Sequence, residues 1–250
     1  MVIKFEIISE LRGAKMKPIM GIIARSRKND IGMDSMICAD GYRRAVINSG
    51  GIPIMIFPTQ KFNYEETPPR EAPKLTDEEK EDLIRELELC DGFIFPGGNK
   101  IYDYDMFIAE YAYENDIPSL GICLGMQTMT AFLSNTEDRR EILERVSTEK
   151  IEHQTFDTYV HNVKIKKESK LYSIIGKEEI KVNSRHKFII KNMDYGDNVM
   201  ISCYSEDGFP EGIETDKKKF YLGVQWHPES LHEIDENHLS LFKALIDACK

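Results

Sequence analysis

The stretch Ile117-Pro-Ser-Leu-Gly-Ile-Cys123-Leu-Gly-Met-Gln127 decides how we interpret the rest of the chain. A short apolar run ends at a Gly-x-Cys-x-Gly turn, apolar residues then recur at helical spacing as far as Leu133, and Asn135 closes the run. This pattern predicts a strand, a tight turn and a helix, in which small neighbours leave one reactive side chain exposed. A cysteine at a helix N-terminus meets a partial positive charge that favours the thiolate. The alternative is an inert cysteine buried at the junction.

Length and charge narrow the class of protein. The chain has 250 residues and a formal net charge of −10. This length fits a single α/β domain over residues 1–250, with residues 1–16 as an N-terminal extension. The acidic balance argues against nucleic acid as a partner, because phosphate binding requires a basic face. No apolar run approaches the roughly 20 residues that cross a bilayer, and the polar N-terminus is unlike a signal peptide. We therefore expect a cytoplasmic protein with no membrane partner.

The five cysteines are widely scattered, and no CxxC pair or Cys/His metal spacing is present. An odd number of scattered cysteines suits a reducing compartment, where one of them can act as a working thiol. We expect neither a metal ion nor an organic cofactor.

The first half of the chain alternates buried strands with amphipathic helices. Continuous apolar runs at 18–24, 52–57 and 91–95 predict strands, and a further strand is predicted at 2–8. Helices are predicted before Gly50-Gly51, after the capping-box residue Thr76, and over 104–114, with an exposed loop at 58–75. This β-α-β order predicts a mostly parallel central sheet covered on both faces, which is a three-layer α/β sandwich.

Beyond residue 135 the pattern changes to short alternating segments that predict a few antiparallel strands continuing the sheet. These segments are 160–165, 179–182, 198–204, 211–214 and 220–226. A final amphipathic helix follows Asp235.

The segment Gly223-Val-Gln-Trp-His227-Pro-Glu229 supplies the second chemical element. In extended backbone His227 and Glu229 point to the same side, and the proline between them stiffens the pair. A carboxylate beside an imidazole holds one tautomer and stabilises the imidazolium, as a thiol nucleophile requires of its base. Taken alone, a His-x-Glu pair also fits an ordinary surface contact.

The turn Pro96-Gly97-Gly98 is the third element. A glycine turn at the end of a parallel strand can direct backbone N–H groups at a developing oxyanion, and the amide of Leu124 can supply another donor. All three elements follow predicted strands, and ligands in open α/β sheets bind at the carboxyl ends of strands.

This combination resembles the class I glutamine amidotransferases, which have a flavodoxin-like fold and a Cys-His-Glu triad. Within them the chain most resembles the gamma-glutamyl-gamma-aminobutyrate hydrolase group. The resemblance covers residues 17–231 and includes the stretches Lys17-Pro-Ile-Met-Gly-Ile22, Gly50-Gly-Ile-Pro53, Val182-Asn-Ser-Arg-His186 and Asp207-Gly-Phe-Pro-Glu-Gly-Ile-Glu214.

The resemblance implies a role for each matching residue. Cys123 would be the nucleophile, His227 the general base and acid, and Glu229 its orienting partner. The Gly97–Gly98 turn and Leu124 would form the oxyanion site, and Gln127 would line the substrate pocket. For His186, a substrate contact and a structural role stay equally open.

Three departures from the family concern the substrate's amine side. The segment Asn99–Asp105 is shorter than the usual substrate loop, Leu124 stands where arginine is common, and Lys187-Phe188 replace His-Gln. Among the remaining histidines, His153 and His161 are expected to organise local structure, whereas His232 and His238 are expected at the surface.

The resemblance implies a hydrolase that cleaves the gamma-glutamyl amide of a small molecule through a thioester, in amine catabolism. One alternative is a glutaminase component that delivers ammonia to a partner synthase. The other is a catalytically silent binding protein of the same fold. A homodimer is compatible with each of them.

Overall fold

The computed structural model describes residues 16–134, 136, 141–146 and 150–250. The strand predicted at 2–8 and the helix end predicted at Asn135 lie outside these residues. Among the helices of the described part of the chain, none has the length and apolar character needed to cross a membrane.

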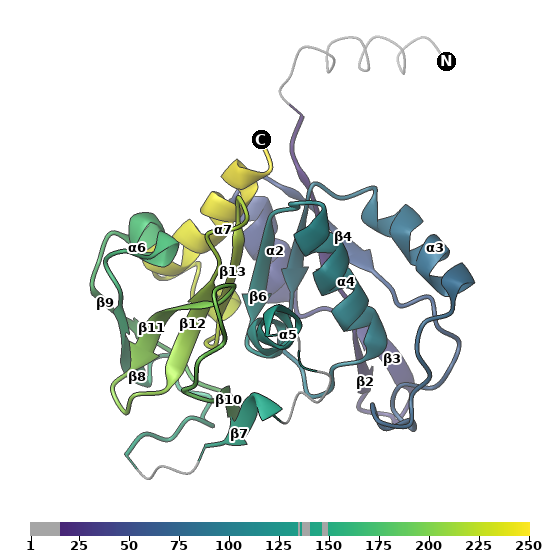
Figure 1. Cartoon of the computed structure of the whole chain (residues 1–250), viewed down its shortest axis with the longest axis horizontal. Helices are drawn as coiled ribbons and strands as arrows, with labels where there is room; N and C mark the ends of the chain where they lie inside the picture. Colours follow the sequence, from purple (N-terminus) through teal and green to yellow (C-terminus); the bar gives the residue numbers. More distant parts are fainter. Residues whose placement is uncertain (1–15, 135, 137–140, 147–149) are drawn as a thin grey trace.

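A nine-stranded sheet runs through the middle of the molecule in the order β4-β1-β5-β6-β13-β12-β11-β8-β9 (Figure 1). The parallel half contains β4 (Ile52–Ile56), β1 (Ile19–Ile23), β5 (Gly92–Phe95), β6 (Ser119–Ile122) and β13 (Tyr221–Val224). The antiparallel half adds β12 (Pro210–Glu214), β11 (Met200–Ser205), β8 (His161–Ile165) and β9 (Glu179–Val182). The predicted α/β class is confirmed, with an antiparallel half as extensive as the parallel one.

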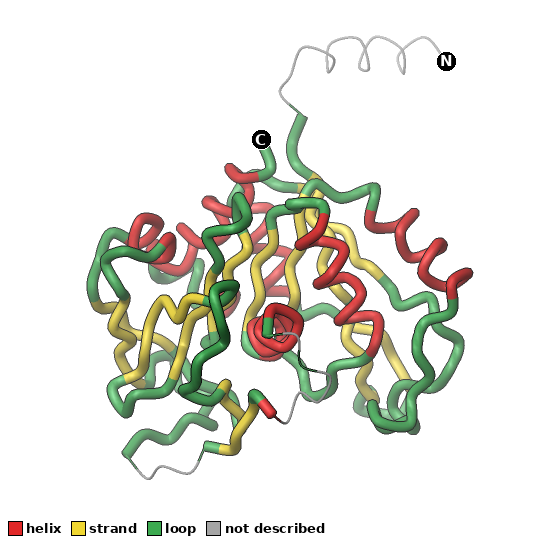
Figure 2. Tube along the Cα trace, viewed as in Figure 1, coloured by secondary structure: helices red, strands yellow, loops and turns green. Residues whose placement is uncertain are grey.

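Helices cover both faces of this sheet (Figures 1 and 2). One apolar core lies under α3 (Asp77–Leu87), α4 (Asp103–Glu114) and α5 (Leu124–Leu133). A second core lies under α2 (Asp40–Asn48), α6 (Lys170–Ile175) and α7 (Glu236–Ala248). Every residue of β5, β6 and β13 is buried, which explains why these strands are continuous apolar runs.

Two small two-stranded sheets were not predicted. Strand β2 (Arg25–Lys28) pairs with β3 (Asp34–Ile37), and β7 (Leu143–Arg145) pairs with β10 (Phe188–Ile190). The short helix α6 was missed as well. Strands β2, β3 and β7 carry polar residues, and β10 is apolar but only three residues long, so none of them has the longer apolar run on which the strand predictions rested.

Two expectations about exposure were wrong. The segment 58–75 contains neither helix nor strand, but Tyr64 and Leu75 within it are buried in the core. His232 and His238, expected at the surface, are 3% and 0% exposed. The ring of His238 lies under Trp226, which donates its indole N–H to Nδ1 at 3.3 Å, and His232 Nδ1 lies 3.0 Å from the carbonyl of Glu229.

Candidate active site

Cys123 lies at the predicted turn between β6 and α5. It is the residue before the helix, with φ 54° and ψ −106°, a conformation that side chains other than glycine rarely adopt. Its N–H donates to the carbonyl of Val224 at 2.8 Å, which joins the turn to the end of β13. The side chain is 7% exposed and borders a pocket, so it is nearly buried but reachable.

The two glycines beside the cysteine are required by close packing. A Cβ at Gly125 would lie 1.9 Å from the carbonyl oxygen of Phe95. A Cβ at Gly121 would lie 2.4 Å from the sulfur of Met129. Both distances are far below van der Waals contact, so the Gly-x-Cys-x-Gly pattern reflects the contact of α5 with the neighbouring strands.

His227 and Glu229 are in contact, but not through the extended backbone that was expected, because Pro228–Ser230 form a short 3₁₀ helix, η2. They follow β13, and Nδ1 of His227 lies 2.6 Å from Oε1 of Glu229. A Cβ at Gly97 would lie 2.7 Å from His227 Cε1 and 3.5 Å from Cys123 Cβ. The glycine turn, the cysteine and the imidazole therefore meet at one point at the carboxyl ends of β5, β6 and β13.

The electrostatics of this group favour a charged imidazole. Burial lowers the pKa of His227, but the Glu229 carboxylate and the Cys123 side chain, both hydrogen-bonded to the ring, outweigh it and raise the pKa to about 10. At neutral pH the arrangement therefore places a positive charge beside the sulfur of Cys123.

Asn183 holds the backbone of His227 from the neighbouring loop. Its Oδ1 accepts the N–H of His227 at 2.8 Å, and its Nδ2 donates to the carbonyl of the same residue at 2.9 Å. Asn183 is fully buried. It belongs to the stretch Val182–His186 that carried part of the family resemblance, but a backbone clamp on a residue 44 positions away has no signature in the sequence.

The glycine turn has two different N–H groups. Gly97 N–H donates to the hydroxyl of Tyr42 at 3.0 Å, so this donor is already engaged. Within the described residues the N–H groups of Gly98 and Leu124 donate no hydrogen bond, and both residues border the pocket. Gly98 and Leu124 are accordingly the available oxyanion donors, whereas Gly97 provides close approach to His227.

A buried ion pair holds the Pro96-Gly97-Gly98 turn in place through the carbonyl of Pro96. Arg25 pairs with Asp105 and donates from Nη2 to the carbonyl of Pro96 at 2.9 Å. Asp105 also accepts the N–H of Tyr102 at 2.8 Å, at the start of α4. Neither Arg25 nor Asp105 was singled out from the sequence, because a lone arginine after an apolar strand carries no recognisable pattern.

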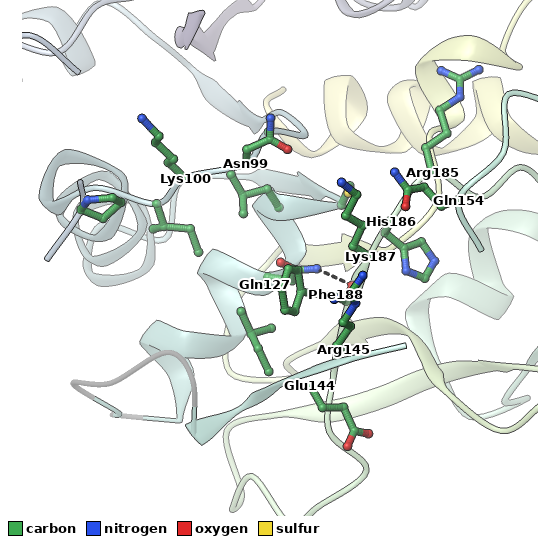
Figure 3. Close-up of a pocket in the computed structure, with 16 residues that line it drawn as sticks. Asn99, Lys100, Gln127, Glu144, Arg145, Gln154, Arg185, His186, Lys187 and Phe188 are labelled. Carbon is green, nitrogen blue, oxygen red and sulfur yellow. Dashed lines mark hydrogen bonds between the residues drawn. The ribbon is translucent and has the colours of Figure 1, made fainter. Parts of the chain in front are cut away.

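Cys123 opens into a pocket of about 610 Å³ (Figure 3). Gln127 is part of its wall, and its Nε2 donates to the carbonyl of Phe188 at 3.0 Å and to Oε1 of Gln225 at 3.1 Å. The pocket is bordered by the 98–101 turn, by the start of α5, and by residues of β7, β10 and the adjoining loops; four of these are basic, namely Lys100, Arg145, Arg185 and Lys187.

His186 is among the residues that border the pocket, but its ring is buried. The side chain is 1% exposed, and its Nε2 lies 3.3 Å from Oε1 of Glu211. In Figure 3 the ring points away from Gln127. Of the two roles left open for His186, the burial of its ring favours the structural one. His153 and His161 are buried beside the same carboxylate.

Solved structures with low sequence identity share this fold. A protein of Thermoplasma acidophilum described as a GMP synthase component has a TM-score of 0.63 at 15% identity and covers 94% of this chain and 96% of its own. The glutaminase domain of a Trypanosoma brucei CTP synthase with bound acivicin has a TM-score of 0.63 at 17% identity, covering 93% of each chain. At these identities the likeness concerns the fold alone.

Sequence comparison gives the family. The Peptidase C26 family matches residues 102–229. A protein of Rickettsia prowazekii described as glutamine amidotransferase-like is 30% identical over 307 aligned positions, which cover 94% of this chain and 99% of the relative. The CTP synthase of Borreliella afzelii is 32% identical over 191 residues, which are 65% of this chain but 36% of that enzyme. The chain therefore belongs to the Peptidase C26 family of class I glutamine amidotransferase-like hydrolases, which includes gamma-glutamyl hydrolases.

Proposed function

We propose that this protein is a cysteine-dependent hydrolase that cleaves the gamma-glutamyl amide bond of a small compound, such as gamma-glutamyl-gamma-aminobutyrate or a related gamma-glutamyl amine. One observation carries the proposal. Cys123 stands at a strained turn on a pocket of about 610 Å³, beside an imidazole whose other nitrogen lies 2.6 Å from a carboxylate.

The first half of the reaction forms a thioester. In the resting site His227 already carries the proton, so the sulfur of Cys123 attacks the gamma-carbonyl carbon as a thiolate beside the imidazolium. The electron pair of the C=O bond moves to oxygen, where the N–H groups of Gly98 and Leu124 donate to it. When this pair returns, the C–N bond breaks, and His227 gives its proton to the leaving amine. Glu229 holds the ring throughout through Nδ1.

The second half releases glutamate. Water adds to the thioester carbonyl, and His227 takes its proton. The same oxyanion donors stabilise the second tetrahedral intermediate, which expels the cysteine sulfur. The expelled thiolate and the imidazolium that has taken the proton of water are the starting pair, so the site returns to its resting state. All the groups that catalyse these steps belong to this chain.

The charge of the pocket supports an amine that carries a carboxylate. Lys100, Arg145, Arg185 and Lys187 border the cavity, against one acid, Glu144. Arg145 and Lys187 are exposed, and neither makes an ion pair among the residues that the structure describes. A basic rim on a chain with a net charge of −10 is a local feature that would attract an anionic leaving group.

A second function is supported by particular relatives. The CTP synthases are among the curated relatives, and the solved structures include a protein described as a GMP synthase component. In such a role the chain would hydrolyse glutamine and deliver ammonia to a partner synthase, with the same cysteine chemistry.

One experiment separates these functions. Purified protein is incubated with glutamine and with a panel of gamma-glutamyl amines, some with a carboxylate on the amine part and some without. Glutamate release is measured, with Cys123→Ala as the control. Release from the amines without a partner supports the hydrolase. Hydrolysis of glutamine only after a synthase is added supports the second function. No release, together with no labelling of Cys123 by a glutamine-like electrophile, would refute both.

A further inference from the structure

A second cluster of titratable side chains lies behind the wall of the pocket. Three imidazole nitrogens surround one oxygen of Glu211: Nε2 of His186 lies 3.3 Å from Oε1, Nε2 of His161 lies 3.8 Å from it, and Nδ1 of His153 lies 3.9 Å from it. All four side chains are at most 1% exposed. The ligand atoms of His153, His186 and Glu211 all lie within 4.8 Å of one another. We refer to these four residues as the histidine–glutamate cluster.

Most of the polar atoms inside the histidine–glutamate cluster have no hydrogen-bond partner. Among the described residues, both carboxylate oxygens of Glu211, both ring nitrogens of His186 and Nε2 of His161 have no hydrogen-bond partner. A buried carboxylate without hydrogen bonds or a counter-charge is strongly unfavourable. The cluster therefore needs a cation between the carboxylate and the imidazoles, either a proton or a metal ion.

The outer ring nitrogens of His153 and His161 are held from outside the cluster, whereas Nδ1 of His186 has no partner among the described residues. Nε2 of His153 lies 3.0 Å from Oδ2 of Asp207, and Nδ1 of His161 lies 3.1 Å from the carbonyl of Asn162. An acceptor at these positions places the ring proton on that nitrogen, which leaves the lone pairs of the inner nitrogens directed at Glu211. Outer acceptors on carboxylate or carbonyl oxygen orient histidine ligands in the same way around bound metal ions.

We infer that the histidine–glutamate cluster binds one divalent transition-metal ion with a preference for nitrogen ligands, and that Zn²⁺ suits it best. Ligand atoms about 2.0–2.1 Å from Zn²⁺ in a tetrahedron are about 3.3 Å apart. The contact between His186 and Glu211 already has this length, whereas the ligand atoms of the set His153, His186 and Glu211 lie as a whole within 4.8 Å of one another and must close around the ion. His161, with Nε2 at 3.8 Å from Oε1 of Glu211, is the imidazole that would move in as the fourth ligand. Four protein ligands without an open position are typical of a structural zinc site.

One inner nitrogen has a competing partner. Nδ1 of His153 lies 3.0 Å from the hydroxyl of Ser184, and that hydroxyl also lies 3.0 Å from the carbonyl of His153. When Nδ1 binds the metal, the hydroxyl keeps its bond to the carbonyl. No polar group is left without a partner by this exchange.

The site would connect distant parts of the chain close to the candidate catalytic base. His161 lies on β8, Glu211 on β12 and His186 on the loop after β9. The same loop contains Asn183, which holds the backbone of His227. The metal would thus have a positioning role and would not take part in the chemical step.

The test measures metal content and does not depend on any activity. Protein purified without a histidine tag is treated with a chelator, dialysed free of it, incubated with Zn²⁺ and passed through a desalting column. Elemental analysis should then find close to one zinc per chain. Co²⁺ in place of Zn²⁺ should give the intense visible absorption of a tetrahedral site, and Zn²⁺ should raise the Tm.

Three variants locate the ion. Glu211→Gln and His161→Gln each remove one ligand and should lower zinc retention at least tenfold. Cys123→Ala serves as the matched control, because the pair of Cys123 and His227 is the other place where zinc could bind. It should retain the metal and the Co²⁺ spectrum unchanged.

Two results would overturn the proposal. One is wild-type protein without zinc above background and without a tetrahedral Co²⁺ spectrum, which would mean that protons supply the positive charge of the cluster. The other is loss of the metal in Cys123→Ala. The wild-type Co²⁺ spectrum decides the question even if both cluster variants fail to fold.

Discussion

Replacing Glu229 with glutamine tests the electrostatics of the candidate active site most directly. Glutamine keeps the size and one oxygen of the side chain, but it removes the charge that lies 2.6 Å from Nδ1 of His227. In the wild-type protein the pKa of His227 is raised to about 10, with burial acting against Glu229 and Cys123. In Glu229→Gln, Cys123 alone remains to raise the pKa of His227 against the lowering that burial causes.

The expected size of the change follows from the strength of such a bond. A hydrogen bond to a charged group contributes about 1.5–3 kcal/mol. Since about 1.4 kcal/mol corresponds to one pKa unit, the pKa of His227 should fall from about 10 to about 8 or 9. The raised pKa also stabilises the fold, fully below the ordinary value of 6.5 and progressively less as pH rises through 10. Wild type should therefore be more stable than the variant at pH 6, and the difference should shrink towards pH 10.

NMR titration of the ring nitrogens in ¹⁵N-histidine-labelled protein measures this pKa without any substrate. The chain has six histidines, and the His227→Asn variant identifies the signal of interest. Glu233→Gln is a matched control, because Glu233 lies four residues away, is exposed and pairs with Arg44 at 3.0 Å. Its titration should equal that of wild type. An unchanged midpoint in Glu229→Gln would refute the argument that the carboxylate raises the pKa of His227.

Three further outcomes are expected. Gly125→Ala places a methyl group 1.9 Å from the carbonyl oxygen of Phe95 and should destabilise the protein by about 1–3 kcal/mol or more. Urea unfolding measures this loss, and an unchanged midpoint would contradict the close packing of α5 on β5. Asn183→Ala leaves the N–H and the carbonyl of His227 without hydrogen-bond partners, which costs about 1–3 kcal/mol for each group. Because the imidazole is then held less firmly, the variant should lower kcat more than it raises KM in the glutamate-release assay. Lys187→Gln should raise KM by roughly 1.4- to five-fold for amines that carry a carboxylate, as expected for about 0.2–1 kcal/mol from an exposed charge. Equal effects on neutral amines would argue against an anionic leaving group.

The parallel half of the fold could be predicted from the sequence because its information is local. Strands buried on both faces are continuous apolar runs, as in Phe93–Phe95, and the capping box at Thr76 is formed as expected, with Glu79 N–H donating to the hydroxyl at 3.2 Å. The spacing of His227 and Glu229 was also sufficient to predict their contact, since only one residue separates them.

Other features depend on residues that are far apart in the chain and so could not be predicted. Strands β7 and β10 pair Arg145 with Phe188, and each strand is only three residues long, which is too short to give a pattern of its own. The hydroxyl of Tyr42 accepts a hydrogen bond from the N–H of Gly97, 55 positions away in the chain, so this N–H is not available to an oxyanion. The burial of His238 follows from the position of Trp226 above it. Polar residues become core residues in such cases because the folded chain supplies their partners.

The backbone of Cys123 has a consequence for how this protein can be improved. A residue with a side chain held at φ 54° carries strain on the order of 1–3 kcal/mol, which the surrounding packing must hold in place. Glycine would adopt the same angles without strain, so a selection for thermal tolerance alone would favour glycine at position 123 and discard the thiol. Stability and chemistry therefore compete at a single residue. A search for variants with higher thermal stability should keep Cys123 and substitute other positions.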